Sequence, residues 1–140
     1  MFVLNSKINV LQLDVFIYLF HRSPALCVWS VQSEYCEAET FRASCPFSTL
    51  VVVRTALYGR MRLGRCVLRD YGYVGCFADV VRHMDVICSG RRTCSVRIPD
   101  AMLDRANPCP KDFKTYLLIS YDCVPGLQLF VLTSAQIHIY

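Results

Sequence analysis

Residues 88–96 read Cys88-Ser89-Gly90-Arg91-Arg92-Thr93-Cys94-Ser95-Val96 and lie in a segment that is rich in cysteine. Of the nine cysteines in the chain of 140 residues, all except Cys27 fall between positions 36 and 123. The same segment contains Tyr58-Gly59-Arg60, Asn107-Pro108-Cys109 and Tyr116-Leu117. Because so many thiols in a short chain are typical of paired cysteines, the sequence predicts a disulfide-linked domain outside the cytosol.

A zinc module is the alternative for a cysteine-rich chain. It needs cysteines about two to four residues apart, or cysteines followed by closely spaced histidines. The nearest cysteines are Cys88 and Cys94, with residues 89–93 between them, and the histidines at positions 21, 83 and 138 are scattered. We therefore expect no metal and no cofactor.

The size and charge of the chain narrow its class further. The cysteine-rich segment spans about 90 residues, so its core is limited and each native disulfide typically contributes about 2–5 kcal/mol to stability. The formal net charge is +4 and the arginines are spread along the chain, which favours a solvated surface over a site that steers anionic glycans. Because no sustained basic run is interleaved with aromatic residues, we expect no nucleic-acid partner.

The two ends of the chain differ from its cysteine-rich middle. Residues 10–20 are mostly apolar and resemble a secretory leader. The resemblance is loose, because Asp14 interrupts the apolar stretch and no clean cleavage site follows it. The C-terminal stretch is also apolar and would add a strand or form a tail ordered by contact, and both stretches are too short to span a bilayer. We expect a leader-like or irregular segment over 1–34, a folded domain over 35–124 and an apolar tail over 125–140.

The pattern of apolar residues in the middle of the chain is mainly that of strands. Apolar and polar residues alternate over 41–45, 94–98 and 117–123, and 50–53 is a β-branched run. One segment has a helical period, with apolar residues at Phe77, Val80, Val81, Met84, Ile87 and Cys88. The sequence therefore predicts an α+β fold: a small disulfide-stapled antiparallel β domain of about five strands, with one or two helices and long loops.

The order of the cysteines and the motifs around them resemble the galactose/rhamnose-binding lectin domain, also called the sea-urchin-egg-lectin (SUEL) type. This domain occurs in fish-egg lectins and as a module of latrophilin-like receptors. The matching residues are Tyr35-Cys36-Glu37, Cys45-Pro46, Ala56-Leu57-Tyr58-Gly59-Arg60, Cys66, Cys76, the segment 88–96, Asn107-Pro108-Cys109-Pro110, Tyr116-Leu117 and Tyr121-Asp122-Cys123. The resemblance implies a SUEL-type lectin domain over 35–124.

The resemblance also implies which cysteines pair, because the spacing of the cysteines alone cannot select one pairing among the many possible. The implied pairs are Cys36 with Cys66, Cys45 with Cys123, Cys76 with Cys109, and Cys88 with Cys94. Cys27 lies outside the matching residues and has three alternatives: loss with a leader, a free thiol, or an intermolecular bridge.

A sugar site needs a carboxylate or amide to accept hydrogen bonds, a cation or N–H to donate them, and an apolar or aromatic surface for the C–H face of the ring. The residues of this kind are Glu37, Tyr58, Arg60, Asn107 and Lys114. The resemblance implies that Glu37 and the Tyr58-Gly59-Arg60 motif form the monosaccharide pocket together with an acidic residue and a lysine, for which Asn107 and Lys114 are the candidates.

Two positions depart from the pattern of the family. Asn107 stands where the family usually has Asp, and a neutral amide makes weaker hydrogen bonds than a carboxylate. Thr115 stands directly before Tyr116-Leu117, where the family has Lys, and Lys114 lies one residue earlier. Either a shift of the loop brings Lys114 to the pocket, or Asp112 replaces the missing carboxylate.

Each candidate also has a purely structural interpretation. Tyr58 and Arg60 would equally serve packing and local hydrogen bonding, and Gly59 would serve a turn that requires a positive φ. Glu37, on composition alone, is a solvated residue at a strand edge.

Two functions follow from these observations. The first is a calcium-independent lectin module, secreted or on a cell surface, whose partners are glycans with terminal galactose or rhamnose-like sugars; Glu37 and Tyr58-Gly59-Arg60 favour it. The second is a non-lectin adhesion or receptor module that binds a cell-surface protein on the same scaffold; Asn107 and Thr115 favour it.

We do not expect an enzyme, because neither a nucleophile with its base nor a paired-carboxylate motif stands out. His83 and Asp85 are two residues apart on the predicted helix and do not share a face. We expect both to face solvent.

Overall fold

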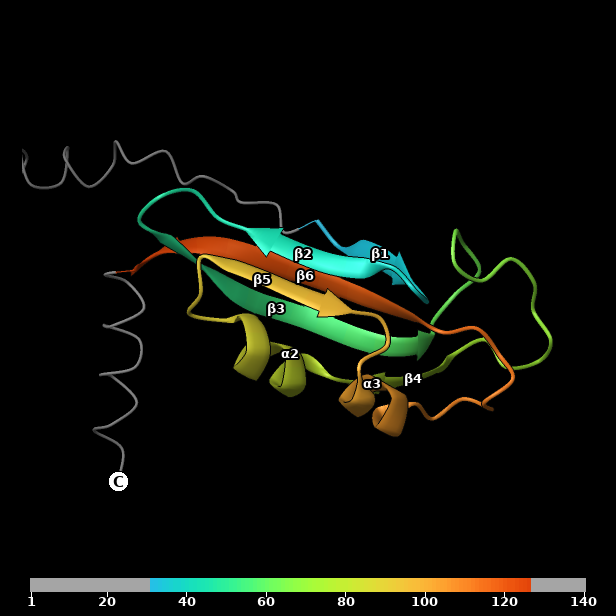
Figure 1. Ribbon diagram of the computed structural model, residues 1–140. Coiled ribbons are helices and arrows are strands. Elements are labelled where there is room, and N and C mark those ends of the chain that lie inside the picture. Colours follow the sequence, from blue (N-terminus) through green and yellow to red (C-terminus); the bar gives the residue numbers. More distant parts are fainter. Residues whose placement is uncertain (1–30, 127–140) are drawn as a thin grey trace, which may run out of the picture.

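The computed structural model describes residues 31–126, which form six strands and two helices (Figure 1). In chain order the elements are β1 (Ser33–Cys36), β2 (Thr40–Ser44), β3 (Thr49–Arg60), β4 (Cys76–Asp79), α2 (Val81–Cys88), β5 (Thr93–Arg97), α3 (Ala101–Ala106) and β6 (Tyr116–Pro125). The leader-like stretch, Cys27 and nearly all of the apolar tail fall on residues 1–30 and 127–140, outside the described residues. Within 31–126, no helix is long and apolar enough to cross a membrane.

The strands form two antiparallel sheets, which confirms the predicted α+β class. One sheet has the strand order β1-β6-β3-β4, and the other pairs β2 with β5. In Figure 1 the β2–β5 pair lies over the face of the β3–β6 pair, and α2 packs against β3 and β5. Phe41 and Ala43 point from β2 into the core, whereas Arg42 and Ser44 are exposed, so the alternation predicted for 41–45 is confirmed.

Strand β6 carries buried residues on both of its faces. Leu117 and Ile119 belong to the main core between the two sheets, whereas Tyr116 and Leu118 pack with Val67 in a second, smaller cluster. Because β1 and β3 pair with its two edges, β6 is enclosed on every side at this end. The second cluster fixes the segment that follows β3 against the outer face of the sheet.

The helix predicted from Phe77 begins at Val81 instead, and this boundary was wrong. Cys76–Asp79 forms strand β4 and pairs with the end of β3. The Asp79 carboxylate accepts a hydrogen bond from the Val81 N–H at 2.9 Å, which turns the chain between the strand and the helix. Phe77 therefore lies on a strand and remains 48 % exposed.

Gly59 lies within strand β3 and not in the turn expected for it. Its φ is +146°, and a Cβ atom at this position would lie 2.4 Å from the carbonyl oxygen of Cys76. Such a distance is far below van der Waals contact, so only glycine allows β4 to approach β3 this closely. Tyr58-Gly59-Arg60 is thus the end of a buried strand.

Contrary to the expectation, His83 does not face solvent. Asp85 is exposed, as expected. The imidazole Nε2 of His83 lies 2.8 Å from the Asp100 carboxylate, which also accepts hydrogen bonds from the N–H groups of Met102 and Leu103 and so caps α3. Burial on its own raises the pKa of Asp100, but these hydrogen bonds together lower it. The expectation for His83 failed because α3 begins beside α2, a contact that the period of the helix does not reveal.

Four disulfides join Cys36 to Cys66, Cys45 to Cys123, Cys76 to Cys109, and Cys88 to Cys94, which are the pairs that the resemblance implies. The second of them ties the end of β2 to β6, and the fourth closes the connection between α2 and β5. The first and third attach two irregular segments, 61–75 and 107–115, to strands β1 and β4.

Removing Cys45–Cys123 should lower the free energy of unfolding more than removing Cys88–Cys94. The two bridges span sequence separations of 78 and 6, and the loop-closure entropy predicts a loss of about 4–5 kcal/mol for the long loop and about 2 kcal/mol for the short one. Denaturant unfolding of Cys45→Ala/Cys123→Ala, with Cys88→Ala/Cys94→Ala as the matched control, measures both. Equal losses would contradict this prediction.

Candidate functional site

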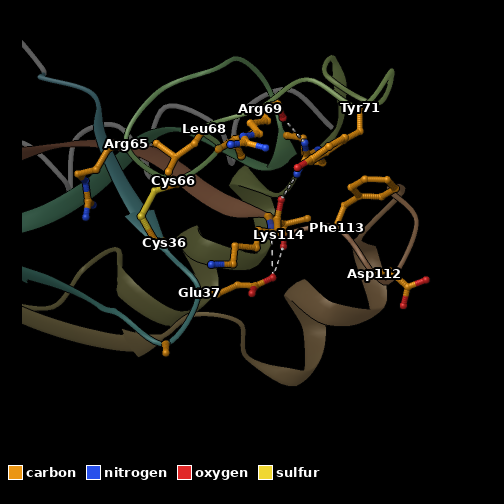
Figure 2. Close-up of a pocket in the computed structure, with 14 residues that line it drawn as sticks. Cys36, Glu37, Arg65, Cys66, Leu68, Arg69, Tyr71, Asp112, Phe113 and Lys114 are labelled. Atoms are coloured by element: carbon orange, nitrogen blue, oxygen red, sulfur yellow. Dashed lines mark hydrogen bonds between the residues drawn. A yellow bond between two sulfur atoms is a disulfide. The ribbon is translucent and has the colours of Figure 1, made fainter.

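A cavity of about 660 Å³ lies at the end of the four-stranded sheet, where β1 and β3 end and β6 begins. Its walls come from the turn after β1 and from the two irregular segments, 61–75 and 107–115. In Figure 1 these two segments project from the same end of the sheets. The Cys36–Cys66 disulfide borders the cavity and holds one of the segments at the end of β1 (Figure 2).

A chain of hydrogen bonds runs from the core to the edge of this cavity. The Tyr58 hydroxyl and the Thr115 Oγ1 are 2.7 Å apart, and both side chains are buried. Thr115 also donates to the Glu37 carboxylate, from its N–H at 3.2 Å and from its Oγ1 at 3.4 Å. Because a carboxylate only accepts, the Thr115 hydroxyl donates to Glu37 and accepts from Tyr58.

The two hydrogen bonds from Thr115 orient the Glu37 carboxylate. The side chain of Glu37 is exposed and borders the cavity, and both bonds from Thr115 reach its Oε1 atom. Among the described residues, Oε2 has no hydrogen-bond partner, so it is available as an acceptor. Burial raises the pKa of Tyr58, an effect that the hydrogen bond to Thr115 partly offsets, so the phenol stays protonated at neutral pH.

Arg60 joins the two irregular segments beneath the cavity. Arg60 is buried, with 3 % of the residue exposed. It donates to the carbonyl oxygen of Lys114 at 2.8 Å and to that of Arg69 at 3.1 Å, and it lies 5.0 Å from the centre of the Phe113 ring. Its Nε atom has no partner among the described residues. Arg60 therefore acts mainly as a link between the walls.

The remaining candidates divide between the cavity and its surroundings. Lys114 and Asp112 border the cavity, and in Figure 2 the Asp112 carboxylate points away from Glu37. Asn107 follows α3, does not border the cavity, and accepts a hydrogen bond from the Cys109 N–H at 2.9 Å. The fold thus brings Glu37, Arg60 and Lys114 together over Tyr58, and it leaves Asn107 outside.

Several residues of the site were not among the candidates. Thr115, which the sequence showed only as a departure from the family pattern, is the central residue of the hydrogen-bond chain. Its position directly before a buried strand was the one signal in the sequence that could have pointed to this role. Other missed residues that border the cavity include Arg65, Leu68, Arg69, Tyr71 and Phe113, and they lie in segments without a periodic pattern.

Arg65, which borders the cavity, forms an ion pair with Glu39 near the end of β1. Arg65 Nη1 lies 2.5 Å from one carboxylate oxygen of Glu39, and Nη2 lies 2.8 Å from the other and also bonds the Glu34 carbonyl oxygen. The hydrogen bonds from Arg65, followed by the one from the Cys36 N–H, lower the pKa of Glu39 to about 2. Both side chains are largely in water, where solvent screens their attraction, so the pair contributes modestly to the stability of the fold.

The Glu39 carboxylate should make the fold sensitive to acid. Because its folded pKa of about 2 lies below the ordinary value of 4.5, its contribution to stability is present above pH 4.5 and is lost as the pH falls towards 2. We expect Glu39→Gln to reduce the slope of the free energy of unfolding against pH in this interval, as measured by urea unfolding. The exposed Asp85→Asn is the control for removing a charge, and an unchanged slope in Glu39→Gln would refute the prediction.

Thr115→Val should destabilise the domain by about 1–3 kcal/mol, because it leaves the buried Tyr58 hydroxyl without its partner and removes a donor from Glu37. Thr115→Ser keeps the hydroxyl and should retain most of the stability. Thermal and denaturant unfolding of the two variants measure the difference. A valine variant as stable as the serine variant would show that the hydrogen-bond chain contributes nothing.

Within residues 31–126, no group of three or more His, Cys, Asp or Glu side chains lies close enough together to hold a metal ion. The polar groups around the cavity are the Glu37 carboxylate, which the N–H and the hydroxyl of Thr115 hold, the Asp112 carboxylate, a lysine, arginines and backbone carbonyls. These groups match hydrogen bonding to a neutral polyhydroxylated ligand.

Comparison with known proteins agrees with the family resemblance of the sequence. The family model described as the D-galactoside/L-rhamnose binding SUEL lectin domain matches residues 43–123. The chain is also similar to adhesion G protein-coupled receptor L1 of Mus musculus, Bos taurus and Homo sapiens, with 35% identity over 94 residues in each case. The similar part covers 64% of this chain and 6% of each receptor, so the chain spans a small fraction of the length of these relatives. Because the family match covers more than half of the chain, this protein belongs to the SUEL lectin domain family of carbohydrate-binding modules.

Proposed function

We propose that this chain is a lectin module that binds a terminal galactose or rhamnose-like sugar in the cavity beside Glu37. The observation that carries the proposal is the exposed Glu37 carboxylate, which buried partners hold in place at the edge of a cavity that also contains a lysine and aromatic side chains. These groups are the acceptor, the donor and the apolar surface that a pyranose requires. The family match begins after Glu37, so the role of this residue rests on the geometry.

In this proposal two of the polar side chains that border the cavity, Glu37 and Lys114, contact the terminal sugar. Glu37 accepts hydrogen bonds from sugar hydroxyls through Oε2, and the Lys114 ammonium donates to hydroxyl or ring oxygens. In Figure 2 the Lys114 side chain extends over the part of the cavity that Glu37 borders, which supports a shift of the loop over replacement by Asp112. Tyr58 and Arg60 position these groups from below.

Asn107 has a different role in the proposal. Its amide oxygen is engaged by the Cys109 N–H, so it shapes the segment 107–115 instead of contacting the ligand. The acidic acceptor of the family is then absent at this position, and Glu37 is the main charged acceptor. We therefore expect weaker monosaccharide binding than a site with two carboxylates would give.

We also propose an extracellular location for this module. Four disulfides in residues 36–123 would not persist in a reducing cytosol. The similarity to receptors named for adhesion supports the same location.

Retention on immobilised sugars tests the proposed function. The oxidised, folded protein should be retained on galactose or rhamnose columns, and retention should persist in EDTA because the ligand groups need no metal. Glu37→Ala removes one charge-assisted acceptor, a loss of about 1.5–3 kcal/mol or about 10- to 150-fold in affinity. Asp85→Ala removes an exposed carboxylate on α2, remote from the cavity, and should bind as the wild type does.

Two results would overturn the proposal. If the folded wild-type protein, checked by far-UV circular dichroism, is retained by neither sugar, the cavity is not a lectin site and the scaffold is better explained as a protein-binding module. If Glu37→Ala and Asp85→Ala both bind like the wild type, the sugar site lies elsewhere.

A further inference from the structure

Three aromatic side chains form a wall beside the cavity. Phe113, from the segment 107–115, packs against Tyr71 with the ring centres 5.9 Å apart and against Tyr73 with the centres 4.8 Å apart. Both tyrosines come from the segment 61–75. Although they are packed in this way, Tyr71 remains 60 % exposed and Tyr73 46 % exposed. We call these three residues the aromatic wall.

The wall is supported from behind and held at its ends. The Arg60 guanidinium lies 5.0 Å from the centre of the Phe113 ring and bonds carbonyl oxygens of both irregular segments. The Cys36–Cys66 and Cys76–Cys109 disulfides attach the same segments to β1 and β4. An aromatic surface that is ordered before a ligand arrives loses little conformational entropy on binding.

The wall is continuous with the cavity described above. Tyr71 and Phe113 border that cavity together with Glu37 and Lys114, and Leu68, which is 81 % exposed, borders it as well. Figure 2 shows Glu37 at one side of the cavity, and Tyr71 and Phe113 at the other. The volume of about 660 Å³ falls in the range of pockets for drug-sized ligands, which are larger than one pyranose ring.

We propose that the aromatic wall is a second subsite, which binds the sugar unit linked to the terminal sugar held by Glu37. The ligand of this module is then an oligosaccharide of at least two units. This inference rests on the proposed function, because it takes the terminal sugar to lie at the Glu37 end. The second unit places a C–H face of its ring on Tyr71, and the tyrosine hydroxyls accept or donate at its rim.

The position of the wall favours a sugar over another occupant. An exposed aromatic surface away from the cavity would fit many apolar partners, as Phe47 at 83 % exposure would. The aromatic wall instead shares one cavity with a carboxylate and a lysine. A linear ligand that begins at Glu37 and leaves the cavity on the side of Tyr71 must pass over that tyrosine. The polar contacts at Glu37 therefore determine which ligand reaches the aromatic wall.

Isothermal titration calorimetry with ligands of two lengths tests the second subsite. The ligands are methyl galactoside and lactose, or methyl rhamnoside and a rhamnose-terminated disaccharide if the columns select rhamnose. The wild-type protein should bind the disaccharide about two- to tenfold more tightly, the gain expected from one aromatic stacking contact. Tyr71→Ala should remove this advantage and leave the affinity for the methyl glycoside within about twofold. Phe47→Ala, the matched control, should keep both affinities.

The outcomes separate this inference from the proposed function. If the wild type binds the methyl glycoside and the disaccharide equally, or if Tyr71→Ala keeps the advantage of the disaccharide, the second subsite is refuted and the lectin function stands. If Tyr71→Ala weakens both ligands equally, the wall belongs to the first subsite and the inference is wrong. If the folded wild type binds neither ligand, the proposed function fails and the second subsite fails with it.

Discussion

The antiparallel ladder between β3 and β6 determines where the residues at the base of the cavity lie. It pairs Tyr58 with Leu117 and Gly59 with Tyr116, so the end of β3 and the residues before β6 meet at one place. This register brings the Tyr58 hydroxyl to Thr115, and it brings the Arg60 guanidinium to the carbonyl oxygen of Lys114. A shift by one position would turn these side chains to the opposite face and would leave buried polar groups without partners.

The disulfides extend this order to segments that have no strands or helices of their own. Residues 61–75 and 107–115 carry most of the cavity wall, and such segments seldom stay ordered in a small domain without cross-links. The Cys36–Cys66 and Cys76–Cys109 bridges attach them to strands. The framework therefore serves binding as well as stability, since it holds the acceptor, the donor and the aromatic surface in one arrangement.

Much of the fold could be predicted from local patterns. The alternation over 41–45 lies on β2, where burial of one face leaves a period of two in the sequence. The segment 117–123 also lies on a strand, β6, although both faces of that strand are buried near its start. The start of the helix at Phe77 was wrong, because pairing with β3 prevailed over helical spacing there. Gly59 was assigned to a turn because its contact with the backbone of Cys76 joins positions that no local pattern connects.

The sequence by itself determined the family, the α+β class and the presence of a cysteine framework, because these depend on residue types and their order along the chain. Only the tertiary structure decided the makeup of the cavity. It joined Thr115 to Tyr58 and Glu37, turned Asn107 into a residue that shapes its own loop, and set Tyr71 against Phe113. Each of these contacts depends on how separate segments approach one another, and irregular segments carry no period from which that approach could be read.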